Sequence, residues 1–382
     1  MYFVHTFFGV IGFMSMTLAA CYVVLTLIAA ALWRHRRISA PPPEPQPVTV
    51  LKPLCSAEPG LYEHLRTFCQ QDFPKFQMVF GVRDPTDPAL IAVRRLAAEF
   101  PSLSIDVVVN PTLHGTNYKI SNLMNMIEHA RYDVLVMADS DTWVKPDYLA
   151  SVTAPLQNPA VGLVTCIYHD VPTASLWSRL GAMYVNEWYM PSVLLAQLFG
   201  FQGYVSGQTL CLRRHTLEAV GGLKSIVNHL ADDYRLGELV RGLGLKIVMS
   251  RYLVTAQHDE MSLSSLLWHE LRWMRTLRVL RPRSFCFLFS SFSLLLAGSG
   301  MLLCLLAEPT VSMAAWGLFW ITVSARLLLY LMHRLPSERL TDLWLLPVRD
   351  LLICGVWCCC FFTARVVWRG SAFDVDADGI LR

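Results

Sequence analysis

The feature that most constrains this chain is an almost uncharged run, residues 7–33, that is rich in Val, Leu, Ile, Ala and Met. A membrane-spanning helix needs about 20 such residues, so the run is long enough to cross a bilayer. A cleaved signal peptide would start with a charged segment, and residues 1–6 hold no Lys or Arg. The basic segment 34–37 follows at once. Because positive residues stay on the cytoplasmic side, we expect the chain after this span to be cytoplasmic.

Three further apolar runs lie near the C-terminus, at residues 285–306, 311–332 and 343–362. The first two are expected to span the membrane. The third contains Arg349 and Asp350, which are costly at mid-membrane and are expected to pair or to lie near an interface. The pattern leaves open whether this run spans or is re-entrant, and therefore on which side the C-terminus lies.

Composition agrees with a soluble domain carried by a few spans. Hydrophobic residues make up 54% of the chain and charged residues 16%, against about 25% charged in soluble domains. This excludes disorder and disfavours a purely soluble protein, while a net charge of +3 is too small to indicate nucleic acid as a partner. The predicted plan is a transmembrane anchor (1–37), a Pro-rich linker (38–47), a catalytic domain (48–261), an interfacial helix (262–284), and C-terminal membrane segments with a tail (285–382).

The cysteines indicate a reducing compartment. There are 11 of them, and they show neither a CxxC pair nor a zinc-ligand spacing. We therefore expect no disulfide framework and no structural zinc.

Residues 48–261 predict an α/β fold. Short apolar strands alternate with helical stretches, which is typical of βαβ units and a mostly parallel sheet. Ligands of such sheets bind at the carboxyl ends of the strands. The strands are expected at 48–51, 78–82, 105–109 and 134–138, and the helices at 59–70, 88–100 and 120–131.

Carboxylates follow two of these strands. Asp139 and Asp141 end the strand 134–138 and could hold a divalent cation against a bound diphosphate, because Mg²⁺ and Mn²⁺ prefer oxygen ligands and substrate phosphates. A polar turn is the alternative. Asp84 follows the strand 78–82, and on its own it is better explained as a turn or N-cap aspartate.

Other polar residues suggest further roles. Asp233, in the pair Asp232-Asp233, could act as a general base towards a hydroxyl group, although adjacent acids are also common at helix starts. Lys52 and Lys119 could meet phosphate charge or simply be solvated lysines. Residues 264–279 form a basic amphipathic stretch typical of a helix in the membrane interface, and its Arg272-Trp273 pair could instead face an active site.

The order of these motifs resembles that of the membrane-bound inverting glycosyltransferases of the GT-A type. The series is Asp84, then Asp139 and Asp141, then Asp233, and last the stretch His269-Glu270-Leu271-Arg272-Trp273. Within that group the sequence is most similar to the ceramide glucosyltransferase family. The resemblance runs from about residue 48 to 370, and His269 departs from the Gln or Arg of the family's Q/R-x-x-R-W motif. Matching stretches include 51–54, 82–84, 87–89, 119–123, 161–164, 231–234 and 368–370.

The resemblance implies a GT-A (Rossmann-like) domain with N- and C-terminal transmembrane helices. It further implies that Asp84 contacts the nucleoside of a UDP-sugar, that Asp139 and Asp141 hold the nucleotide and a Mg²⁺ or Mn²⁺ ion, and that Asp233 deprotonates the acceptor. Arg272 and Trp273 would close over the diphosphate and shape the acceptor site. His269 could still donate to a phosphate, and Lys52 and Lys119 are expected to bind the donor from their own positions.

The acceptor is expected to be a lipid. The stretch 184–203 is apolar and aromatic, typical of core packing or of an interfacial lip. Similarity to the bacterial branch favours transfer of N-acetylglucosamine to a hopanoid (bacteriohopanetetrol) by a multi-pass protein of the cell inner membrane, with the catalytic domain in the cytoplasm. The alternative is transfer of glucose to ceramide. A processive polysaccharide synthase and a non-enzymatic membrane subunit are the remaining hypotheses. Oligomeric state is not indicated.

Overall fold

The computed structural model describes residues 2–35, 44–201, 203–257, 259–307, 311–334, 340–362, 366–368, 371–373 and 379–380. The chain divides into two compact units. We call Arg37–His169, Phe201–Asp259 and Phe373–Arg382 the sheet unit, and Met1–Arg36, Asp170–Gly200 and Glu260–Ala372 the helical unit. Most of the predicted linker (38–47) and the pair Arg369-Gly370 lie outside the described residues.

One half of the sheet is parallel, as predicted. Its strands lie in the order β3-β2-β1-β4, and each pairs in parallel with its neighbour. Parallel strands end at the same edge of a sheet, so the segments after β1, β2 and β4 share one edge. The bounds are Val48–Pro53 for β1, Phe76–Val82 for β2, Ser104–Val109 for β3 and Val134–Met137 for β4.

The other half corrects the expectation of a mostly parallel sheet. Strand β7 runs antiparallel to both β4 and β6, and β5 runs antiparallel to β8. The strand–helix alternation that predicted parallel strands stops at β4, because β5 follows it with no helix between them. The remaining strands are β5 (Thr142–Trp143), β6 (Val161–Asp170), β7 (Leu210–Arg213) and β8 (Lys246–Ala256).

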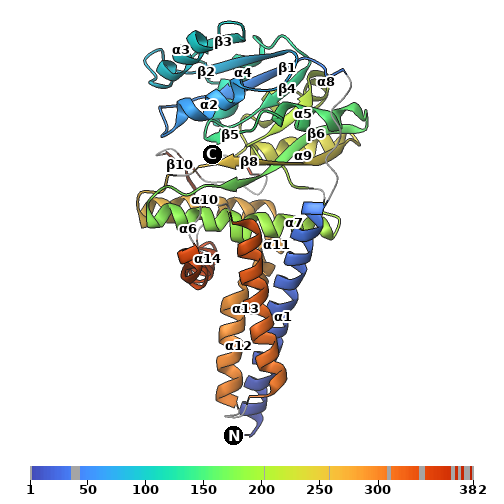
Figure 1. Ribbon diagram of the computed structural model, residues 1–382, viewed down its shortest axis with the longest axis vertical. Coiled ribbons are helices and arrows are strands. Elements are labelled where there is room, and N and C mark those ends of the chain that lie inside the picture. Colours follow the sequence, from blue (N-terminus) through green and yellow to red (C-terminus); the bar gives the residue numbers. More distant parts are fainter. Residues whose placement is uncertain are drawn as a thin grey trace. The chain divides into compact units, whose positions relative to one another are not determined.

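Helices pack against the sheet around an apolar core that includes Leu51, Leu123, Leu135 and Leu212. Helix α4 contacts β1 and β2, α2 contacts β5 and α3, and α9 contacts β8 (Figure 1). All three predicted helices are present, with slightly different ends. The bounds are Leu61–Cys69 for α2, Ala89–Glu99 for α3, Tyr118–Ile127 for α4, Tyr148–Thr153 for α5, Arg214–Ala219 for α8 and Asp232–Gly242 for α9.

The helical unit contains three long apolar helices side by side (Figure 1): α1 (Tyr2–His35), α12 (Ser293–Ala307) and α13 (Met313–His333). Helix α1 contacts both of the others. It comes close to α12 at Gly12 and Gly300, where a Cβ added to Gly12 would lie 2.5 Å from the Gly300 carbonyl oxygen. Small residues at helix crossings are typical of membrane bundles, where close backbone contact drives association.

Two of the described helices, residues 3–35 and 313–333, are long and apolar enough to cross a membrane. The run predicted at 285–306 is broken: Pro282–Ser291 and Ser293–Ala307 meet at an angle of 62° and would be a third span if they cross together. The third predicted run contains α14 (Leu345–Cys359), whose 15 residues are fewer than the roughly 20 that a span needs.

Shorter helices complete the helical unit. The aromatic stretch folds as α6 (Leu176–Tyr184), a π-helical turn (Val185–Tyr189) and α7 (Met190–Leu198), while the basic stretch forms α10 (Leu263–Leu280). Arg349 does not pair with Asp350: its guanidinium makes two 2.6 Å hydrogen bonds to the Glu270 carboxylate on α10. Consecutive residues on a helix do not face each other, which explains the difference.

Candidate active site

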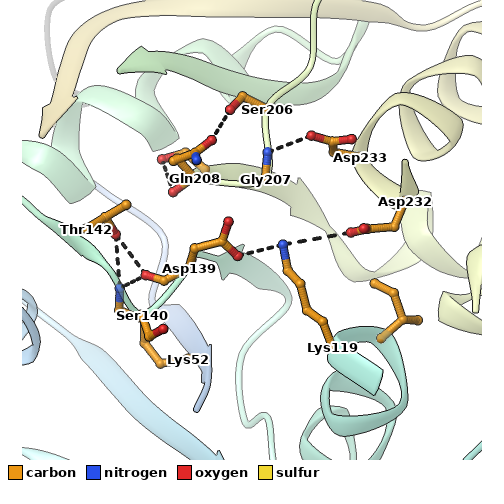
Figure 2. A network of polar contacts seen from close by, with 12 residues as sticks. Lys52, Lys119, Asp139, Ser140, Thr142, Ser206, Gly207, Gln208, Asp232 and Asp233 are labelled. Atoms are coloured by element: carbon orange, nitrogen blue, oxygen red, sulfur yellow. Dashed lines mark hydrogen bonds and ion pairs between the residues drawn. The ribbon is translucent and has the colours of Figure 1, made fainter. Parts of the chain in front are cut away.

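The predicted carboxylate loop lies where strand β4 ends. The backbone NH of Ala138 donates to the carbonyl of Leu51 at 3.2 Å, so the parallel pairing continues almost to Asp139. This places Asp139 at the shared carboxyl edge of the sheet, beside the end of β1 (Figure 2). The end of strand β4 therefore determines where along the sheet this loop begins.

Lys119 lies between two carboxylates at this edge. Its Nζ is 2.6 Å from Oδ1 of Asp139 and 3.8 Å from Oδ2 of Asp232 (Figure 2). Burial would lower the pKa of Lys119, but the charges of Asp139 and Asp232 outweigh it and raise that pKa well above its ordinary value. The ammonium therefore stays charged at any physiological pH.

Asn117 fixes the start of the helix that carries Lys119. Its side chain accepts from the backbone NH of Ile120 at 3.1 Å, which is an N-cap contact. Its amide nitrogen donates to the carbonyl of His229 at 3.0 Å and to Oδ1 of Asp232 at 3.2 Å. One buried side chain thus links the α4 start to the α9 start.

The carboxylate of Asp233 has a pKa close to neutral pH. Its Oδ2 accepts from the backbone NH of Gly207 at 2.9 Å, and its Oδ1 accepts from the NH of Tyr234 at 2.7 Å. Burial and the adjacent negative charge of Asp232 raise the pKa of Asp233 to about 7. A carboxylate in this state can take a proton from a hydroxyl group near pH 7.

Gly207 brings the backbone close to all of these groups. A Cβ built on it would lie 2.9 Å from Nζ of Lys119, 3.2 Å from Oδ2 of Asp139 and 3.7 Å from Oδ2 of Asp233. A side chain at this position would therefore press on the ion pair. Glycine lets the chain approach without a steric conflict.

Lys52 lies behind the carboxylate loop and is fully buried. Its Nζ donates to the backbone carbonyl of Asp139 at 2.5 Å and to Oγ1 of Thr142 at 3.2 Å (Figure 2). The same nitrogen lies 3.5 Å from the centre of the Phe68 ring. Burial lowers the pKa of Lys52 to about 7, although the charges of Asp141 and Asp139 oppose the shift.

The donor set of the loop fits a magnesium or manganese ion that is shared with a ligand. Asp139 and Asp141 supply carboxylate oxygens from one loop. Within the part of the chain that the structure describes, no three His, Cys, Asp or Glu side chains gather as a ready metal site. Mg²⁺ is commonly held by one or two carboxylates, with phosphates and water completing its shell.

Asp84 lies at the end of β2 and is exposed. Its Oδ1 accepts from the backbone NH of Thr86 at 2.7 Å and from the Thr86 hydroxyl at 2.6 Å. These hydrogen bonds lower the pKa of Asp84. The contacts agree with the turn interpretation, and a role towards a nucleoside stays a prediction.

The motif residues on α10 belong to the helical unit. His269 places Nδ1 2.6 Å from Oε1 of Glu260, and its ring centre lies 4.1 Å from that of Trp273. The Trp273 ring is in turn 5.3 Å from Tyr184, and the Arg272 guanidinium lies 6.0 Å from the Trp273 ring centre. The structure thus gathers Lys52, Lys119, Asp139 and Asp233 in the sheet unit, while the donor role of the α10 residues stays a prediction.

Several contributing residues were not assigned from the sequence. Asn117 carried an N-cap signal, since it precedes a helical stretch. The only signal at position 207 is the glycine itself, which can mark a close approach of the backbone. Glu58 accepts from the hydroxyl of Ser140 at 2.9 Å and had no local signal at all. Asp232 was noted only as the neighbour of Asp233, and its contact with Lys119 depends on the tertiary fold.

Curated relatives of the chain include two proteins of Caenorhabditis elegans. It is 23% identical over 282 residues to ceramide glucosyltransferase 1, covering 71% of this chain and 60% of that protein. It is 22% identical over 273 residues to ceramide glucosyltransferase 3, covering 71% and 59%. The chain thus spans about three fifths of the length of these relatives.

A similar solved structure is the mannosyltransferase PcManGT of Pyrobaculum calidifontis in complex with GDP-Man and Mn²⁺, with a TM-score of 0.52 and 18% sequence identity. The match covers 93% of this chain and 99% of that one. At this identity it shows the fold, which is the GT-A-like α/β arrangement expected from the sequence. The model of glycosyl transferase family 21 matches residues 13–381, and the chain therefore belongs to glycosyl transferase family 21.

Proposed function

We propose that this protein is a membrane-bound inverting glycosyltransferase that moves a sugar from a UDP-sugar to a hydroxyl group of a lipid. The observation that carries the proposal is the arrangement around Lys119, Asp139 and Asp233. It places a permanent cation and a carboxylate with a pKa of about 7 at the carboxyl edge of one sheet. A cation suits a diphosphate leaving group, and the carboxylate suits a hydroxyl nucleophile.

In the proposed reaction Asp233 accepts the proton of the acceptor hydroxyl. The hydroxyl oxygen forms a bond to the anomeric carbon as the bond from that carbon to the diphosphate oxygen breaks, so one displacement inverts the configuration. Lys119 stabilises the negative charge that develops on the departing UDP. Asp139 and Asp141 would hold a Mg²⁺ or Mn²⁺ ion, which would neutralise the same charge.

Asp232 is a poorer candidate for the base. It is buried, its Oδ1 accepts from Asn117, and its Oδ2 lies 3.8 Å from Lys119. Asp233 is only partly buried, and its two carboxylate oxygens accept from the backbone NH groups of Gly207 and Tyr234. The carboxylate of Asp233 therefore keeps more surface for a substrate hydroxyl.

For the acceptor, the relatives favour the ceramide alternative over the hopanoid. Both C. elegans proteins are ceramide glucosyltransferases. We accordingly propose glucose from UDP-glucose and ceramide as the first pair to test, with N-acetylglucosamine and bacteriohopanetetrol as the second. The apolar helices 3–35 and 313–333 support a membrane location. Arg34 at the end of α1 supports a cytoplasmic sheet unit by the positive-inside rule.

The test offers the purified full chain each UDP-sugar with each lipid, and identifies products by mass and by the anomeric proton coupling. A β-linked glucosylceramide supports the proposal. Asp233→Asn is expected to lose activity by about 10²- to 10⁴-fold. Asp133→Asn is the matched control, since the Asp133 side chain is 90% exposed. Transfer to bacteriohopanetetrol alone would reverse the choice of acceptor, and no transfer to any lipid would refute the function.

A further inference from the structure

Lys52 is a buried lysine placed under the loop of Asp139, Ser140 and Asp141. Its side chain has no exposed surface. Taking an ammonium group out of water is unfavourable unless nearby groups compensate it. The compensation comes from the Asp139 carbonyl, the Thr142 hydroxyl and the face of the Phe68 ring. A lysine nitrogen buried with these partners does more than fill space.

The contact of Lys52 with Asp139 is made to the backbone. The Asp139 carbonyl receives Nζ of Lys52 at 2.5 Å and Oγ1 of Thr142 at 2.8 Å. A carbonyl oxygen has two lone pairs, so both are used. Because a peptide group is planar, two donors on its oxygen fix the orientation of the whole Asp139-Ser140 peptide. That peptide determines where the carboxylates of Asp139 and Asp141 leave the chain.

The rest of the loop has supports of its own. The Ser140 hydroxyl donates to Glu58 at 2.9 Å, and the Trp143 ring stacks on His64 at 4.7 Å between ring centres. The backbone NH of Val144 donates to the Thr67 hydroxyl at 3.1 Å. These contacts hold the loop in place without Lys52. Removing the ammonium should therefore loosen the orientation of the Asp139 peptide more than it disrupts the fold.

We propose that Lys52 is a positioning residue for the diphosphate of the sugar donor. It acts through the Asp139 peptide and directs the two loop carboxylates, while Lys119 on the opposite side of Asp139 meets the phosphate charge itself. This inference rests on the proposed function. It gives Lys52 a role behind the loop instead of the direct donor contact that the sequence suggested.

The test measures UDP binding to the purified full chain by isothermal titration calorimetry with Mn²⁺ present, together with thermal unfolding and the Michaelis constants of donor and acceptor. Lys52→Met should weaken UDP binding about tenfold or more, because the Asp139 peptide loses one of the two donors that orient it. Lys52→Gln keeps a donor and should recover part of the affinity. The Michaelis constant of the lipid acceptor should stay within about twofold of the wild-type value, because the Asp139 peptide orients only the groups that bind the sugar donor.

Thr142→Val removes the second donor to the same carbonyl. Its effect on UDP affinity should be non-additive with that of Lys52→Met, because both side chains act on one peptide. Thr49→Val is the matched control: Thr49 is also buried on β1, and its hydroxyl donates to Gln77 at 2.9 Å. It should lower the unfolding temperature and leave UDP affinity unchanged.

The outcomes separate the inference from the function. If the wild type binds UDP and transfers sugar but folded Lys52→Met binds UDP equally well, the inference is overturned and the function stands. If the wild type neither binds UDP nor transfers sugar, the function falls and takes the inference with it. Should Lys52→Met fail to fold, Thr142→Val decides, because it removes the other donor to the same carbonyl. Unchanged UDP affinity in that variant overturns the inference.

Discussion

The Nζ of Lys119 lies 2.6 Å from Oδ1 of Asp139, on the side of that residue opposite to the backbone carbonyl held by Lys52 (Figure 2). The first aspartate of the loop is therefore flanked by two lysine nitrogens that contact different parts of it. Lys119 contacts the side chain of Asp139 from the start of α4, and Lys52 contacts the main chain of Asp139 from the end of β1.

Lys119→Met is expected to lower transfer activity by about 10²-fold, as for loss of one electrostatic donor at an active site. It also leaves Asp139 and Asp232 without the cation between them, so the melting temperature should fall. Lys119→Arg keeps the charge and should retain more activity than Lys119→Met. The assay is the initial rate of UDP release. Equal activity in the two variants would show that the charge of Lys119 is not used.

The pH dependence of the rate should report Asp233. Its pKa is raised to about 7, so the basic form predominates above that pH. We expect kcat/KM to level off above about pH 7 and to fall about tenfold for each pH unit below it. Asp133→Asn should keep the same profile. A rate that is constant down to pH 5 would remove Asp233 from the role of base.

The same shift predicts how stability depends on pH. The folded pKa of Asp233 lies above its unfolded value of 3.8, so the folded state holds the proton more tightly. This favourable contribution is complete below the unfolded pKa and is lost as pH rises through the folded pKa. We therefore measure the change in unfolding temperature that Asp233→Asn causes at each pH. This change should be more favourable to the variant at pH 8 than at pH 5. A shift of the same size at both pH values would contradict the raised pKa.

Gly207→Ala tests the close backbone approach. The added Cβ would lie 2.9 Å from Nζ of Lys119 and 3.2 Å from Oδ2 of Asp139, so the ion pair has to move. We expect a loss of activity of one order of magnitude or more, since small misplacements of catalytic groups are costly. Gly242→Ala is the control, because a Cβ there meets nothing within 4 Å. Comparable rates for the two variants would show that the ion pair adapts.

The sequence was most informative where local pattern decides structure. The strand ending at Met137 and the acidic residues after it could be placed from apolar runs and their ends. The burial of Lys52 could not be predicted in this way, because solvated and buried lysines look alike in a sequence. Nothing local shows that its ammonium meets a carbonyl 87 residues away. The antiparallel half of the sheet was also missed, since β5 and β7 are short and carry little periodicity.

Arg349 shows the same limit in the helical unit and supplies a last prediction. Its guanidinium and the Glu270 carboxylate are both almost fully buried and make two 2.6 Å hydrogen bonds. Arg349→Met alone leaves an uncompensated buried carboxylate. We expect this to lower the free energy of unfolding by about 3–5 kcal/mol. A double variant that carries both Arg349→Met and Glu270→Leu no longer has that buried charge. It should therefore unfold at a higher temperature than Arg349→Met alone. Thermal unfolding of the purified chain measures this, with Arg131→Met, whose side chain is 56% exposed, as the control. A double variant no more stable than Arg349→Met would mean that lost packing around these side chains, and not the unpaired buried carboxylate, causes the loss of stability.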